Sequence, residues 1–381
     1  MENQLFVYKE EIKKNPYNFI CDWAEECLIY TGRNVFSILS LIPCSLILPD
    51  IPSTSGKFRS NINLLLLGNP SSGKSTICSK FEKITYYPYF NREFSSAGIQ
   101  SDLPSMPLSS IIIEDFSQIL DRPDSYGIIK VLEGILGEEK RVSKVTKKEK
   151  INFNAESVAL ICGTNKDLLR YINELEGGLF WRFVPFMIVH SPEERENIGK
   201  YINNGVGDES KSLQANIKEE VIIDYYKFLF NIQGGKNPDI PPIVNYEFNL
   251  EWKNKIFKMW KRGIEYEDYK GINDFNWNRE LQEGYRFIVA HAFLNILNRN
   301  IKRIKIEGKE YGILIPNEED YKIGIGLMKK NIIFKGYIIK AIDINRRIDK
   351  KVEQLKEIIN SNIPSLAKEI LINIYSLSKG N

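Results

Sequence analysis

The segment Ile62–Thr76, INLLLLGNPSSGKST, constrains the fold of this chain more than any other feature. Its apolar run, Leu64–Leu67, is typical of a strand buried in a parallel sheet. The pattern G-x-x-x-x-G-K-S follows that run directly, and Thr76–Glu82 then predicts a helix whose positive N-terminal end faces the loop. A strand, a glycine-rich loop and a helix in this order are typical of a phosphate-binding P-loop. We therefore expect an α/β fold built around a nucleotide site.

Each part of the loop has a chemical role at a polyphosphate. The loop amides can surround phosphate oxygens, Lys74 places a positive charge at the β- and γ-phosphates, and the Ser75 hydroxyl can bind Mg²⁺. The alternative, an accidental Gly-Ser turn that carries a lysine, leaves the preceding strand unexplained. We therefore predict ATP and Mg²⁺ as cofactors. The predicted nucleotide-binding residues are Gly68, Asn69, Pro70, Ser71, Ser72, Gly73, Lys74, Ser75 and Thr76.

Composition narrows the class of protein. The 381 residues are enough for two or three domains, and a net charge of +3 is too small to indicate nucleic-acid binding by itself. Five widely spaced cysteines without a C-x-x-C pair are typical of reduced thiols, and only two histidines are present, which disfavours a transition-metal site.

The apolar run Val35–Pro49 contains Pro43 and is too short to cross a bilayer, so we expect a buried helix and strand there. The N-terminus has no signal-peptide pattern, and we expect a cytoplasmic protein without a membrane partner.

The chain divides into four predicted regions. Residues 1–57 are expected to be helical and to end in the linker 49–57. Residues 58–232 contain alternating strand and helix patterns, which are typical of a parallel α/β core. The expected strands are Leu64–Leu67, Ser110–Ile113, Ser157–Cys162 and Val184–Val189. After a Gly- and Pro-rich boundary, residues 243–331 predict a further, mainly helical region, with helices at Glu251–Lys270 and Asn278–Asn298. Residues 332–381 predict a helical C-terminal tail, with helices at Lys350–Ile359 and Pro364–Ser376.

Two further core strands end in polar residues. The segment SIIIEDF ends in Glu114 and Asp115, at the same sheet edge as the P-loop if the strands are parallel. A P-loop ATPase needs one carboxylate for the Mg²⁺ shell and another to orient water, so both residues are candidate catalytic and metal-binding groups. The segment SVALICGTN ends in Asn165, which either contacts the attacking water or the γ-phosphate, or simply caps a turn.

Arg182 lies among aromatic residues in GGLFWRFVPF. In a ring-shaped ATPase, an arginine at this place can reach the γ-phosphate of a neighbouring subunit and stabilise transition-state charge. The alternative is a structural arginine that stacks on Trp181 or Phe183.

The segment Lys140–Phe153, KRVSKVTKKEKINF, predicts a β-hairpin with a lysine-rich tip. In a ring, copies of this tip would line the central pore. Lys144, Lys147 and Lys148 are then candidate contacts to a DNA backbone. The alternative is a solvated, charged hairpin.

Together these motifs resemble those of minichromosome maintenance (MCM) helicases, AAA+ ATPases that unwind DNA as hexameric rings. The resemblance covers residues 58–330, and its motifs occur in the family's order. The matching segments are FRSNINLLLLGNPSSGKS (58–75), FSSAGI (94–99), IEDF (113–116), residues 129–165, LFWRF (179–183), NRELQEGYRFIVAHA (278–292) and IPNEEDYKIGIGLMK (315–329).

The resemblance implies an AAA+ core with a presensor-1 hairpin, an α-helical lid, and helical extensions at both ends. It implies that Asn165 is sensor 1, and that Arg182 and Arg279 act from a neighbouring subunit as the arginine finger and sensor 2. Arg286 matches a second arginine of the lid helix, or else pairs with Glu283. The implied partners are DNA, further copies of the chain in a hexamer, and replication proteins. The catalytic set becomes Lys74, Glu114, Asp115, Asn165, Arg182 and Arg279.

The chain departs from the MCM pattern in several respects. Its Walker B order is Glu-Asp, so Asp115 is one methylene shorter than the usual catalytic glutamate; either water positioning is weakened or Glu114 shares the role. There is little room between Ile99 and Ile113 for the family's helix-2 insert, and only about sixty residues precede the core, so we expect the family's large N-terminal domain with its zinc site to be lacking. In these respects, and over residues 131–186, including the stretches 154–165 and 180–186, the chain is similar to superfamily 3 viral and plasmid helicases.

The expected function is therefore an ATP-dependent helicase or translocase that replicates a mobile element, plasmid or virus. A replication initiator or loader with slow hydrolysis is one alternative, favoured by the altered Walker B pair. A protein-remodelling machine is another, although the hairpin tip offers lysines in place of the apolar pore residues typical of that class. Residues 363–381 resemble the first helix of a winged-helix unit, or form a simple packing helix.

Overall fold

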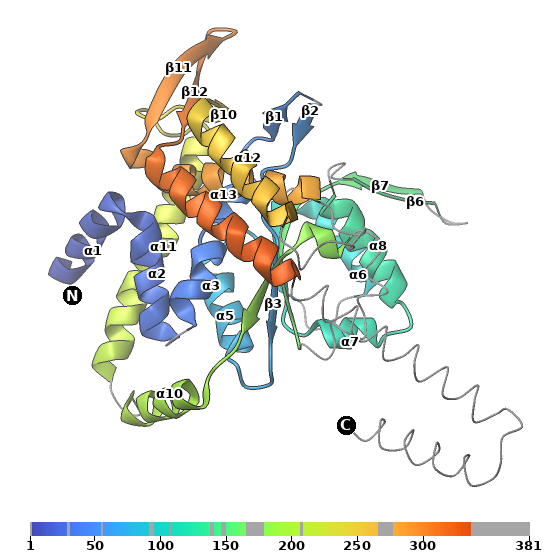
Figure 1. Ribbon diagram of the computed structural model, residues 1–381, viewed down its shortest axis with the longest axis vertical. Coiled ribbons are helices and arrows are strands. Elements are labelled where there is room, and N and C mark those ends of the chain that lie inside the picture. The colour runs from blue at the N-terminus through green and yellow to red at the C-terminus, as the bar shows by residue number, and fades with distance from the viewer. Residues whose placement is uncertain are drawn as a thin grey trace, which may run out of the picture. The chain divides into compact units, whose positions relative to one another are not determined.

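The structure is a computed structural model (Figure 1) that describes residues 2–28, 31–54, 56–90, 95–106, 108–137, 141–145, 150–164, 179–205, 209–265 and 277–336. Contacts divide the chain into two units, Met1–Phe334 and Lys335–Asn381, and the description below concerns the first. Three predicted site residues, Asn165, Lys147 and Lys148, lie outside the described residues, as do the helices predicted after residue 337.

A five-stranded parallel sheet forms the centre of the predicted core, with the strand order β4-β5-β8-β3-β9. Its strands are β3 (Leu64–Gly68), β4 (Pro88–Phe90), β5 (Leu108–Ile113), β8 (Glu156–Gly163) and β9 (Val184–Ile188). The four strands predicted from apolar runs are confirmed, and only the three-residue β4 was not anticipated. Every residue of β3 is buried, as its unbroken run of leucines predicts. Because all five strands are parallel, their carboxyl ends meet at one edge.

The helix after the P-loop, α5 (Lys74–Ile84), is held by α11 (Glu209–Gln233). Lys80 and Lys83 of α5 donate to the two carboxylate oxygens of Glu219, at 2.7 and 2.8 Å. Burial alone would raise the pKa of Glu219, but the two ammonium groups lower that pKa below its usual value. The carboxylate therefore stays ionised at neutral pH and fixes the P-loop helix against α11.

The N-terminal region is mainly helical, with α1 (Glu2–Lys14), α2 (Pro16–Cys27), α3 (Gly32–Leu39) and α4 (Ile42–Ile47). The expectation of a helix and a strand in Val35–Pro49 was wrong, because Pro43 lies in the first turn of a second helix, where proline is well tolerated. The predicted linker contains a short antiparallel pair, β1 (Ile51–Ser53) and β2 (Gly56–Phe58). One apolar core includes residues from Ile12 to Ile332, so it continues through the predicted boundary at residue 58. The four-region division stays a prediction.

Between β4 and β9 the chain forms α6 (Ser96–Asp102), η1 (Leu103–Ser105), α7 (Phe116–Leu120), α8 (Ser125–Ile135) and η2 (Phe180–Arg182). The predicted hairpin is confirmed as an antiparallel pair of β6 (Arg141–Val145) and β7 (Lys150–Asn154). Its predicted tip, residues 146–149, lies outside the described part of the chain. After β9 comes α10 (Pro192–Gly205).

The predicted lid contains the expected helices, α12 (Leu250–Glu265) and α13 (Trp277–Leu294), and a further helix over residues 318–334. It also contains a sheet that we did not predict, with β10 (Ile243–Tyr246), β12 (Lys309–Ile315) and β11 (Asn300–Ile306) in that order. After α13 the chain passes through η4 (Ile296–Asn298) into the hairpin β11–β12. In the described ranges, no helix has both the length and the apolar character needed to span a bilayer.

Candidate nucleotide-binding site

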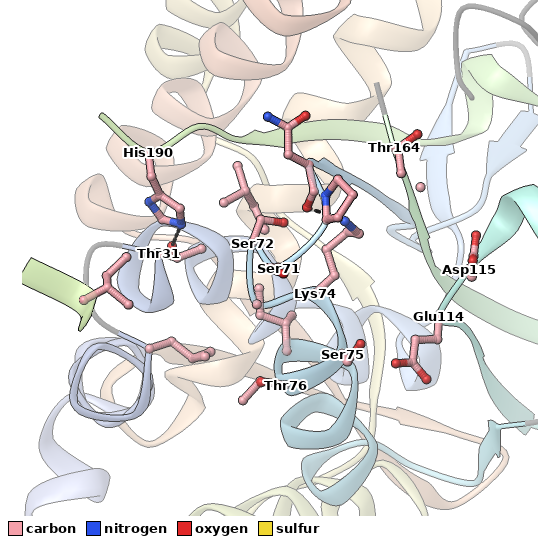
Figure 2. Close-up of a pocket in the computed structure, with 18 of the residues that line it drawn as sticks. Thr31, Ser71, Ser72, Lys74, Ser75, Thr76, Glu114, Asp115, Thr164 and His190 are labelled. Carbon is pink, nitrogen blue, oxygen red and sulfur yellow. Dashed lines mark hydrogen bonds between the residues drawn. The ribbon is translucent and has the colours of Figure 1, made fainter. Parts of the chain in front are cut away.

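One large pocket, with a volume of about 1280 Å³, lies at the carboxyl edge of the parallel sheet (Figure 2). The segments that follow four strands line it: the P-loop after β3, Glu114 and Asp115 after β5, Thr164 after β8, and His190 after β9. The structure thus brings together Lys74, Ser75 and the two carboxylates that the sequence predicts to act together.

The local geometry favours glycine at both ends of the P-loop. A Cβ atom on Gly68 would lie 2.4 Å from the Ser72 Oγ atom, so a larger residue would displace the Ser72 side chain. Gly73 has a φ of +88°, in the left-handed region that glycine adopts without strain, and it is the N-cap of α5. Ser71 also has a positive φ, of 63°. When right-handed and left-handed backbone conformations follow one another, successive amide N–H groups turn toward one point. They then form a concave site that binds anions.

Lys74 and Ser75 begin α5 beneath this loop, as Figure 2 shows. The Nζ atom of Lys74 donates to the carbonyl oxygens of Gly68 at 2.6 Å and Asn69 at 2.9 Å, so the loop itself orients the ammonium group. The first amides of a helix have no acceptor within the helix, and the helix dipole is positive at this end. The loop amides, the helix end and the Lys74 charge therefore suit a polyphosphate.

The two adjacent carboxylates have different surroundings. Asp115 is the N-cap of α7; one of its oxygens accepts from the Ser117 amide at 3.0 Å and from the Ser117 hydroxyl, and the other accepts from Gln118 at 3.2 Å. No hydrogen bond or ion pair to another described residue engages Glu114. In Figure 2 the Glu114 carboxylate turns toward Ser75, whereas that of Asp115 turns away.

These residues offer only oxygen ligands to a metal ion. The described residues contain no cluster of three or more His, Cys, Asp or Glu side chains that could hold a metal by themselves. A Mg²⁺ ion at the pocket would combine the Ser75 hydroxyl and the Glu114 carboxylate with phosphate oxygens and water, which is the ligand set that Mg²⁺ prefers. The donor set therefore fits the predicted ion.

The end of the pocket away from the carboxylates is formed by residues that the sequence did not predict. Thr31 and His190 approach each other there, with the Thr31 Oγ1 and His190 Nε2 atoms 3.2 Å apart (Figure 2). Tyr201 of α10 donates to the Glu26 carbonyl oxygen of α2 at 2.8 Å and so joins the two helices that flank this end. Leu28 and Ile202 are further residues that line the pocket. Apolar walls with a few polar groups are typical of a small-molecule site, and here they suit a nucleoside.

Arg182 and Arg279 do not line this pocket. Both lie at a small cleft beside Asn61 and Asn63, which come just before β3, at the end of the strand opposite the P-loop. Arg182 donates from Nη1 to the Glu133 carbonyl oxygen of α8. Within one subunit, both arginines are therefore separated from the phosphate end of the pocket by the length of β3.

Arg286 lies at the same cleft and is held on two sides. Its Nη1 atom pairs with Glu283 at 2.7 Å, and its Nε atom donates to the Arg59 carbonyl oxygen at 2.7 Å. Both side chains of the ion pair are buried. The predicted alternative for Arg286, an ion pair with Glu283, is therefore confirmed. Through its bond to Arg59, the Arg286 side chain also fixes α13 against the segment before β3.

The predicted DNA contacts are described only in part. Lys144 lies in β6, next to the hairpin tip, and its side chain is outside what the structure describes. The roles of Lys144, Lys147 and Lys148 stay predictions, as does that of Asn165, which directly follows Thr164 of the pocket wall.

No protein-family model matches the chain, and no curated protein matches it either. The geometry of the pocket is therefore the basis for its function.

Proposed function

We propose that this chain is an ATP-dependent DNA helicase or translocase of the MCM-like AAA+ type, which acts as a homohexameric ring in the replication of a mobile element, plasmid or virus. One observation carries the proposal: the P-loop, Lys74, Ser75 and Glu114 converge on one pocket at the carboxyl edge of a parallel sheet. The order of the MCM-like motifs along the chain supports the family assignment.

In this proposal the triphosphate lies along the P-loop. The loop amides and Lys74 bind the β- and γ-phosphates, and the nucleoside lies between Thr31, His190 and α10. Ser75 and Glu114 hold Mg²⁺, which neutralises phosphate charge when bound. Glu114, whose carboxylate is not engaged by other described residues, is also the better placed of the two acidic residues to orient water.

The active site is shared between two subunits. Arg182 and Arg279 lie at the opposite end of β3 from their own P-loop, which supports a role at the pocket of the next subunit. An arginine delivered there stabilises the charge that develops on the transferred phosphoryl group.

The hairpin β6–β7 is joined to the pocket by a single strand. β7 ends at Asn154, β8 begins at Glu156, and β8 leads directly to Thr164 in the pocket wall. A shift of the pocket edge during hydrolysis is therefore transmitted along β8 to the root of the hairpin. In a ring, this movement would carry the tip lysines, and the DNA strand that they contact, along the pore.

A replication initiator or loader with slow turnover is the second candidate function, and the state of Asp115 favours it. Three hydrogen bonds hold this carboxylate at the start of α7. A group held in this way is less able to orient water, so the chain would bind and switch with ATP without processive unwinding.

Conservative variants separate the roles of the two carboxylates. Glu114→Gln removes the charge that faces Ser75, and we expect it to slow ATP hydrolysis about 10- to 100-fold, the range for groups that support a metal site. Asp115→Asn keeps a good N-cap, because asparagine caps helices as well as aspartate does, so we expect less than about a 3-fold loss of hydrolysis and no change in thermal stability. Steady-state phosphate release and thermal unfolding measure the two effects. The opposite order of the two losses would assign the catalytic role to Asp115.

The proposal is tested by the ATPase rate of the oligomeric fraction from size-exclusion chromatography, measured with and without single-stranded DNA. We expect DNA to raise the rate and strands to be displaced from a forked duplex. ATP hydrolysis without strand displacement would favour the loader. Stimulation by unfolded polypeptide but not by DNA would overturn both proposals in favour of a protein-remodelling machine.

A further inference from the structure

The helix α12 (Leu250–Glu265) is strongly basic and does not contribute to the nucleotide pocket. Its sequence, LEWKNKIFKMWKRGIE, has five basic residues and two acidic ones. Of the acidic residues, Glu251 is already paired with Lys255 at 2.7 Å. No described carboxylate pairs with Lys258 or Arg262, so the helix carries an excess of positive charge.

One side of α12 is fixed against the rest of the lid. Trp252 stacks on Tyr321 with the ring planes at 3° and the centroids 5.2 Å apart, and Ile256 is fully buried. Figure 1 shows α12 running beside the helix of residues 318–334, to which Tyr321 belongs. Because this side is packed, the residues on the opposite side of the helix face solvent.

The solvent-facing side combines lysines with an exposed aromatic ring. Phe257 is 50% exposed, and it lies one helical turn from both Lys253 and Lys261. Its ring lies 5.4 Å from that of Trp260. This surface therefore combines the two kinds of side chain that contact a single strand, cations for phosphates and an aromatic ring for a base.

We propose that the solvent-exposed surface of α12 binds single-stranded nucleic acid. Lys258 and Arg262, which lie one turn apart on one row of the helix, contact the backbone phosphates, and Phe257, on the adjacent row, stacks on a base. Residues 257–262 of the helix span about 8 Å, which matches the axial rise of about two nucleotides of one strand. A basic groove or face that carries an aromatic side chain is the usual way in which proteins bind single strands without sequence preference. This site is separate from the hairpin β6–β7 and does not depend on the proposed ATPase.

A membrane surface is a less suitable partner for the same face. Interfacial helices bury a continuous apolar face in the lipid, with charges on the opposite side. In α12 the apolar side chains Trp252 and Ile256 already pack within the protein. Phe257 lies among exposed charges instead of on an apolar stripe.

A charge-reversal variant tests the phosphate contacts. We expect Lys258→Glu combined with Arg262→Glu to weaken binding of a fluorescent single-stranded oligonucleotide at least about 10-fold, and to reduce the slope of log K against log salt by about 1.4, the value for two lost contacts. The matched control combines Lys57→Glu with Lys236→Glu, two exposed lysines elsewhere that likewise form no ion pair with a residue that the structure describes. The control has the same net charge and is expected to bind as the unaltered protein does. Equal binding by the two variants would overturn the proposal.

The stacking contact has a separate readout in the full chain. We expect single-stranded DNA or RNA to quench tryptophan fluorescence through Trp260, and the quench to fall in Trp260→Phe and in Phe257→Leu, which keeps an apolar side chain but removes the ring. Circular dichroism and thermal unfolding check that the variants are folded, and an ATPase assay separates a failed nucleotide site from a failed nucleic-acid face. Binding to phosphatidylserine vesicles together with no binding to the oligonucleotide would overturn the proposal in favour of a membrane contact.

Discussion

Lys74→Ala is expected to lower ATP hydrolysis about 1000-fold, because it removes a positive charge aimed at the phosphates in a pocket where charge stabilisation is the main source of rate. Lys74 Nζ lies within hydrogen-bond distance of the Gly68 and Asn69 carbonyl oxygens, so it is already in place before nucleotide binds. Truncation also removes these two hydrogen bonds to the loop, so we expect the free energy of unfolding to fall by about 1 kcal/mol while the protein stays folded.

Lys80→Ala is the matched control for this prediction. Lys80 lies on the same helix, α5, but it pairs with Glu219 of α11 and does not line the pocket. Its loss should lower the free energy of unfolding by about 1 kcal/mol and leave the catalytic rate within about 2-fold. Phosphate release and urea unfolding, measured on both variants, separate chemistry from stability. Full activity in Lys74→Ala would show that the pocket is not the site of hydrolysis.

The phosphate end of the pocket was predictable because its parts are local in sequence. The strand β3, the P-loop and the start of α5 follow one another within Ile62–Thr76, and parallel strands bring Glu114 to the same edge by geometry alone. The opposite end of the pocket, beside Thr31 and His190, was not predictable in this way. Tyr201 and Glu26 are brought together only by the packing of α10 on α2, across most of the chain, and no short pattern marks either residue.

Two other features of the structure, the N-cap of α7 and the hairpin β11–β12, could have been predicted from the sequence but were not. Aspartate is a favoured N-cap residue, and the Asp115 carboxylate does accept from the Ser117 amide at the start of α7. In the lid, alternating apolar residues flank Glu307-Gly308, where both residues have positive φ angles of 51° and 80°. That pair forms the tight turn between β11 and β12 that we did not predict.

Arg182→Ala is also expected to lower ATP hydrolysis about 1000-fold, but by removing a group that acts on the neighbouring subunit. The arginine lies far along β3 from its own P-loop, so the loss should appear only in the assembled ring. Arg182→Lys should be nearly as impaired, because lysine keeps the charge but lacks the planar pair of donors that bind a phosphate together. Because Arg182 also donates to the Glu133 carbonyl oxygen, thermal unfolding has to be measured beside activity.

A mixing experiment distinguishes this role from a structural one. Arg182→Ala and Lys74→Ala are each inactive alone, but at an interface where the first supplies Lys74 and the second supplies Arg182 the site is complete. In a randomly mixed ring with equal amounts of both variants, about a quarter of the interfaces have this arrangement, so part of the activity should return. Mixing Lys74→Ala with Ser75→Ala should restore nothing, because both changes disable the same side of the interface. If the first mixture also stays inactive, Arg182 supports the fold of its own subunit and the pocket is not shared.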